Sequence, residues 1–123
     1  MELEQLVLSK YLLSEAKAIF FRPNAIAHGI AISLAHDAAE IALRAICKQH
    51  DVSVADKDGF EQTIGKIDAK LSAYMGVVPL KASLQDLNKL RVNFKHYGLA
   101  PEKAASQRAM AYAESFLETA FSQ

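Results

Sequence analysis

Hydrophobic and polar positions alternate with helical spacing in five stretches of the chain, and no stretch has the period-two pattern of a strand. Six of the eight Gly and Pro residues fall between these stretches or at their ends, where helices are expected to start or stop. The pattern therefore predicts helices over about residues 2–21, 24–50, 59–75, 83–98 and 101–123. We expect an all-α, five-helix, up-and-down bundle with short connections, forming a single domain over residues 1–123.

Individual residues set the expected helix ends. Pro23 should end the first helix, because the residue before a proline is pushed out of helical geometry. Ser83 and Asp86 have the spacing of a capping box, which places the start of the fourth helix at Ser83. Pro101 suits the first turn of the fifth helix. The third helix has an amphipathic stripe and should end at Gly76 and Pro79; the stripe consists of Phe60, Ile64, Ile67, Leu71 and Tyr74.

Composition narrows the class of protein. Lys+Arg and Asp+Glu both number 14, so the net charge of zero argues against a protein that coats nucleic acid through many phosphate contacts. The single cysteine, Cys47, excludes an intrachain disulfide, and its apolar surroundings predict a buried, inert thiol. No uncharged apolar run has the roughly 18 residues of a membrane helix, and the acidic start at Glu2 and Glu4 is unlike a signal peptide. We therefore expect a cytoplasmic protein with no membrane partner.

The fourth helix carries the chemistry. At about 100° per residue it places a core face on one arc, formed by Leu87, Leu90, Phe94 and Tyr97. Asn88, Arg91 and Lys95 form a polar arc beside that face. Two cations four residues apart repel each other mildly, so their presence on one face suggests a bound anion, although solvated surface cations are the ordinary alternative.

Arg91 and His96 together supply what a metal-free cleavage of a phosphodiester needs. An arginine stays charged at any working pH, and a histidine exchanges a proton near neutrality. Five positions apart, the two side chains project about 140° from each other on a regular helix. They can meet one phosphate if the helix distorts near Gly98 or if the site is composed across a two-fold homodimer.

The stretch from Leu87 to Gly98, with Arg91, four residues and then His96, resembles the signature of the HEPN superfamily of small all-α domains. The resemblance implies a metal-independent endoribonuclease of toxin or defence type that needs no cofactor. It also implies a homodimer with both motifs lining one cleft, in some relatives paired with a nucleotidyltransferase-like antitoxin. Many relatives are non-catalytic dimerisation or partner-binding modules. In active members the position after the arginine is often a polar residue, whereas here it is Val92.

We therefore expect RNA to be cleaved by transesterification, with His96 as general acid or base and Arg91 stabilising charge on the phosphate. Lys95, Asn88 and Asn93 are the expected substrate-binding residues. DNA lacks the 2′-hydroxyl and should not be cut. Two alternatives remain open: a non-catalytic HEPN-like module that dimerises or binds a partner protein or nucleotide, and a structural bundle without a ligand.

The second helix carries a polar stripe on an otherwise apolar sequence, formed by Ser33, His36, Asp37, Glu40 and Arg44. One interpretation pairs Glu40 with Arg44 and gives His36 a nearby hydrogen bond. A second places this helix beside the cleft, with Glu40 or Asp37 orienting an active-site group. A third makes His36 and Glu40 two ligands of a metal ion, but no further grouping with ligand spacing supports a metal.

Overall fold

The computed structural model describes the backbone of residues 3–75 and 78–121, and the side chains of those residues outside 71–80. This part of the chain folds into five α-helices and contains no strand, which confirms the all-α prediction. The helices are α1 (Leu3–Phe20), α2 (Ala25–Gln49), α3 (Phe60–Met75), α4 (Val78–Tyr97) and α5 (Lys103–Phe121). Within these ranges no helix combines the length and apolar composition that crossing a bilayer requires.

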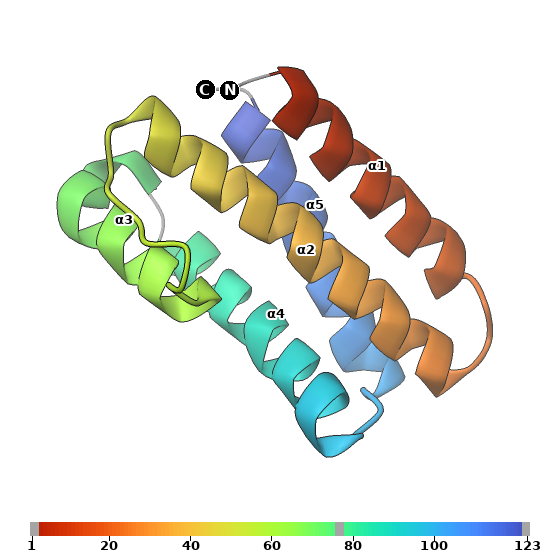
Figure 1. Cartoon of the computed structure of the whole chain (residues 1–123). Helices are drawn as coiled ribbons and strands as arrows, with labels where there is room; N and C mark the ends of the chain where they lie inside the picture. Colours follow the sequence, from red (N-terminus) through yellow and green to blue (C-terminus); the bar gives the residue numbers. More distant parts are fainter. Residues whose placement is uncertain (1–2, 76–77, 122–123) are drawn as a thin grey trace.

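Helix α2 is the centre of the structure and contacts each of the other four helices (Figure 1). Alanine makes this possible, because a small side chain lets neighbouring helices approach closely from several directions. Seven of its alanines are buried, together with Ile32, Leu43 and Ile46. Burying this apolar surface is the main favourable contribution to folding.

Gly29 allows α4 to lie directly against the backbone of α2. A Cβ atom placed on Gly29 would lie 2.2 Å from Cε1 of Phe94, well inside van der Waals contact. The ring of Phe94 thus occupies the space that any other residue at position 29 would need for its side chain. This contact sets the separation of α2 and α4 at the end of the molecule where α4 finishes.

The ends of α2 lie within one residue of the prediction and have clear local causes. The side chain of Asn24 caps the helix by accepting a hydrogen bond of 2.7 Å from the amide of Ala27. At the other end, Asp51 adopts a left-handed backbone with φ of 56°, and the amide of Val52 donates to the carbonyl of Cys47 at 2.8 Å. Cys47 is buried as expected, and burial raises the pKa of its thiol.

Two predicted helix starts were wrong. Helix α4 begins at Val78 rather than Ser83, because Pro79 falls in its first turn, where the missing amide hydrogen is not needed. Helix α5 begins at Lys103, two residues after Pro101. The predicted break at Gly76, and the burial predicted for Leu71 and Tyr74, concern residues or side chains outside those described.

The core face of α4 is narrower than predicted. Leu84 and Leu87 are fully buried, whereas Leu90 and Phe94 are half-buried and Tyr97 is 69% exposed. Tyr97 is the last residue of the helix and lies at the edge of the apolar arc. Gly98, with φ of 65°, then turns the chain away.

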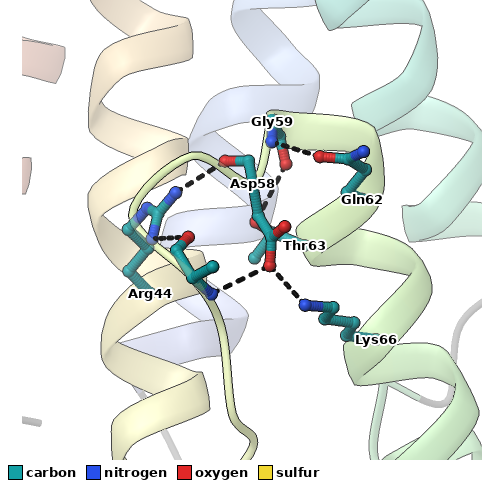
Figure 2. Close-up of polar contacts among 7 residues, drawn as sticks. Arg44, Asp58, Gly59, Gln62, Thr63 and Lys66 are labelled. Carbon is teal, nitrogen blue, oxygen red and sulfur yellow. Dashed lines mark hydrogen bonds and ion pairs between the residues drawn. The ribbon is translucent and has the colours of Figure 1, made fainter.

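The connection between α2 and α3 is held by hydrogen bonds around Asp58 (Figure 2). Arg44 donates from Nη2 to the carbonyl of Asp58 at 2.7 Å, which ties the connection to α2. The carboxylate of Asp58 accepts from the amide of Ala55 and pairs with Lys66 of α3. The bond with Lys66 is the main cause that lowers the pKa of Asp58. This network fixes the start of α3 beside α2.

Substituting Gly29 with alanine should destabilise the protein, because the new methyl group would force Phe94 and α4 away from α2. Overpacking of this kind costs about 1–3 kcal/mol. Chemical denaturation of the purified variant, followed by circular dichroism, measures the change.

Gly65→Ala is the matched control. Gly65 lies inside α3, and a Cβ there meets no atom within 4 Å. Alanine should therefore stabilise the chain by up to about 1 kcal/mol through helix propensity alone. Equal effects of the two substitutions would contradict the role given to Gly29.

Candidate functional site

Arg91 lies on the side of α4 that faces α2, at a half-buried position. Its Nε atom is buried and has no hydrogen-bond partner in the described part of the chain. Nor does the guanidinium make an ion pair with any described carboxylate. A partly desolvated cation with an unused donor favours the binding of an anion.

Lys95, one turn later on α4, adds a second positive charge to the same side of the helix. Its side chain is exposed, and it acts together with Arg91 on the electrostatics of the α2–α4 contact: both cations oppose protonation of His36. The structure therefore brings two of the predicted site residues, Arg91 and Lys95, to one region beside α2.

His36 is the buried polar centre of the α2–α4 contact. Its side chain is 2% exposed, and Nε2 lies 2.8 Å from Oδ1 of Asn88. The oxygen can only accept, so Nε2 carries the proton and Nδ1 is unprotonated. The ring also packs against Phe60 with centroids 4.1 Å apart, and Nδ1 is buried without a partner among the described residues.

This environment keeps His36 neutral. Burial is the largest cause that lowers its pKa to about 4, and the charges of Arg91 and Lys95 lower it further, while the bond to Asn88 acts in the opposite direction. At neutral pH the imidazole therefore orients Asn88 and does not exchange protons. The hydrogen bond predicted for His36 is confirmed, and its partner comes from α4.

Asn88 was predicted to bind substrate, and the structure places it at the α2–α4 contact. Its amide oxygen is engaged by His36. Only its Nδ2 group is left to meet a ligand, next to the side of α4 that carries Arg91 and Lys95.

His96 lies in the last turn of α4 and is exposed. No hydrogen bond joins it to Arg91 or to any other described residue. The helix continues regularly to Tyr97, so the two side chains project about 140° apart. The structure therefore shows no helix distortion that would bring Arg91 and His96 together within one chain.

Asn93 faces a different side of α4 from Arg91. It lines a groove of about 230 Å³ between α4 and α5, together with Asp86, Lys89, Leu90, Ala105, Arg108 and Tyr112. Asn93 and Asn88 therefore lie on different sides of α4, and their side chains face different surfaces of the molecule.

Asp37 and Glu40 are half-buried on α2. Within the described residues neither makes a hydrogen bond or ion pair with Arg91, Lys95 or His96. The predicted pairing of Glu40 with Arg44 is not found, because Arg44 instead donates to the carbonyls of Ala55 and Asp58. No three His, Cys, Asp or Glu side chains gather in the described part of the chain as metal ligands would.

One further cavity lies away from the residues predicted to form the site. It has a volume of about 480 Å³ and lies where the α1–α2 connection meets the start of α5, with buried His28 in its wall. No motif in the sequence links residues 20–28 to residues 101–107; only the hydrophobic surroundings of His28 hinted that it is buried.

The low pKa of His36 predicts a loss of stability in acid. The unfolded chain takes up a proton near pH 6.5, while the folded chain resists it until about pH 4, so stability should fall as the pH is lowered between these values. The loss should be about 3 kcal/mol, since one pKa unit corresponds to about 1.4 kcal/mol. Urea denaturation at several pH values measures it.

His36→Gln should remove most of this pH dependence, because glutamine does not titrate. His96→Gln is the control: it removes an exposed histidine and should leave the dependence unchanged. Asp58 should change the stability only in a more acidic range, because its pKa lies below the ordinary value of a carboxyl group. An unaltered slope in His36→Gln would show that His36 is not the group responsible.

Comparison of the chain with protein-family models, with curated proteins and with solved structures found no match.

Proposed function

We propose that this protein is a metal-independent endoribonuclease of HEPN type that works as a homodimer, with Arg91 binding the scissile phosphate and His96 transferring protons. The observation that carries the proposal is the half-buried guanidinium of Arg91. It has no ion pair among the described residues, and Lys95 lies beside it. Such a group can donate hydrogen bonds to phosphate oxygens.

The side chain of His96 is accessible to a substrate. It is exposed at the end of α4, whereas His36 is buried and neutral with a pKa of about 4. Of these two histidines, only His96 is exposed where a substrate can reach it. The backbone of Gly98 ends the helix two residues later, which leaves the imidazole at the rim of the molecule.

The chemistry would be a transesterification. His96 takes the proton of a ribose 2′-hydroxyl, and the 2′-oxygen forms a bond to phosphorus while the bond to the 5′-oxygen breaks. The 5′-oxygen takes up the proton held by His96, or one from water, as it leaves, giving a 2′,3′-cyclic phosphate and a 5′-hydroxyl end. Arg91, assisted by Lys95, stabilises the charge that develops on the phosphate oxygens.

A homodimer would bring an arginine and a histidine together at one site, which a single chain does not do. The regular helix keeps Arg91 and His96 apart within a chain, so the site would combine Arg91 of one subunit with His96 of the other. Exposed apolar side chains occur where α2 starts and α4 ends: Ile26, Ile30, Tyr97 and Leu99. Covering them against a second copy would be favourable.

A non-catalytic HEPN-like module is the second candidate. Val92 follows Arg91 in place of a polar residue and is half-buried, and Asn88 is engaged in an internal hydrogen bond. These features fit a chain that keeps the fold and the dimer without the reaction. A nucleotidyltransferase-like antitoxin remains a prediction under either candidate.

Purified protein should cleave labelled RNA in the presence of EDTA. His96→Ala should lower the rate by about 10²–10⁴, as expected for loss of a general acid or base. Arg91→Ala should lower it by about 10²–10³ through loss of charge stabilisation. A substrate with a 2′-deoxyribose at the cleavage position should remain intact.

Arg108→Ala is the matched control, because it removes an exposed cation from α5 and leaves the α2–α4 side untouched. It should cleave like the wild type. Equal cleavage rates in all three variants would contradict the proposed site. A folded wild-type dimer that cleaves no RNA would favour the non-catalytic module.

Mixing the two inactive variants tests whether the site is shared. Unfolding and refolding Arg91→Ala with His96→Ala in equal amounts should give heterodimers in which one of two sites is complete. Activity should return to about a quarter of the wild-type level if the residues come from different subunits. No return, although mixed dimers have formed, would place both residues in one subunit's site.

A further inference from the structure

The cavity of about 480 Å³ at one end of the bundle has the size of a small-molecule site. Its walls come from segments far apart in the sequence: the end of α1, the α1–α2 connection, the start of α2 and the start of α5. Figure 1 shows the α1–α2 and α4–α5 connections at this same end. The lining residues are Phe20, Phe21, Arg22, Pro23, Asn24, Ala25, His28, Pro101, Lys103 and Gln107.

His28 is the buried polar group of this cavity. Only 9% of it is exposed, and its ring packs against Phe20 with centroids 4.6 Å apart. The imidazole makes no side-chain hydrogen bond within the described part of the chain. The ring lines the cavity, so a molecule bound there can be its hydrogen-bond partner.

The charges that line the cavity are all positive. Arg22 and Lys103 are exposed side chains that line the cavity, one from the α1–α2 connection and one from α5. Neither makes an ion pair with a described residue, and no Asp or Glu is part of the lining. Glu102 precedes Lys103 but is exposed outside the lining. The excess of positive charge is local, because the whole chain has no net charge.

Two helices begin at this cavity. Asn24 and Ala25 form the start of α2, and Lys103 is the first residue of α5. Neither helix has an acidic side chain in its first turn, whereas α1 has Glu4 and α3 has Glu61. The positive end of the α2 dipole is thus left without an acidic side chain in the first turn, whereas Glu102 precedes the first residue of α5. The α2 dipole reinforces the attraction of Arg22 and Lys103 for an anion.

Asn24 and Gln107 are the polar residues of the remaining lining, and the other residues there are apolar. Phe20, Pro23 and Pro101 form part of the lining, and the ring of Phe21 is 87% exposed at the rim. An exposed aromatic ring beside prolines offers a flat surface on which another ring can pack. A bare inorganic ion would leave this surface unused.

We propose that this cavity binds a small organic anion, with a carboxylate or phosphate head held by Arg22, Lys103 and His28 and an aromatic body packed against Phe20 and Phe21. The site is distinct from the Arg91 and His96 pair and does not depend on the nuclease proposal. It assigns a role to His28, which the helical pattern alone would treat as an ordinary helix residue.

Titration of ¹⁵N-labelled full-length protein, followed by NMR, tests the proposal with four probes. Phenyl phosphate and phenylacetate carry the two possible heads, phenylacetamide is the neutral analogue, and inorganic phosphate lacks the ring. We expect saturable shifts of residues 20–28 and 101–107 with at least one of the two aromatic anions, and much weaker binding of the other two probes. The tighter aromatic anion identifies the head group.

Two sets of variants test the assigned residues. Arg22→Gln with Lys103→Gln should weaken binding about tenfold or more, while Lys10→Gln with Lys57→Gln makes the same charge change outside the lining and should leave it unchanged. His28→Leu should weaken binding more than His28→Gln, which keeps a polar group. Thermal melting confirms that each variant is folded.

Three results would overturn the proposal. One is equal binding of phenylacetamide and the aromatic anions, which would show that charge is not recognised. Another is binding of inorganic phosphate as tight as that of phenyl phosphate, which would show that the ring is not recognised. The third is the absence of saturable shifts at the cavity with every probe in the millimolar range. None of these results bears on RNA cleavage by Arg91 and His96.

Discussion

The close contact between α2 and α4 is the constraint on which the candidate site depends. Gly29 leaves room for Phe94 at one point of the contact, and His36 bonds to Asn88 further along. Between these two points α4 has little freedom to rotate or slide. Arg91 lies in this interval, so its position beside α2 follows from packing and one buried hydrogen bond rather than from any partner of its own.

The two histidines of this region have opposite properties because of where they lie. His36 of α2 is buried against Phe60 and Asn88, close to the two cations of α4, and remains neutral. His96, at the exposed end of α4, has none of these constraints. A buried imidazole orients its hydrogen-bond partner, while an exposed one can contact a substrate. Near the start of α2, His28 is also buried and lines a cavity together with Arg22 and Lys103.

The helices were largely predictable, because helical spacing and turn residues act over a few neighbouring positions. Asn24 capping α2 is an example of such a local cause. The start of α4 was not predicted, since a proline is tolerated in a first turn and Ser83 has capping chemistry without being used as a cap. Tyr97 was assigned to the core by its arc, although exposure at a helix end depends on what packs there. Arg44 bonds to carbonyls of a connection whose path no periodicity describes.

By itself the sequence determined the all-α class, the approximate helix ranges and the side of α4 that carries Arg91 and Lys95. These follow from local propensity and from the fixed rotation of about 100° per residue. Only the tertiary structure decided that Asn88 meets His36, that Asn93 faces α5, and that Arg22, His28 and Lys103 line one cavity. The reason is that such meetings depend on how helices distant in sequence pack together, and no local pattern records that packing.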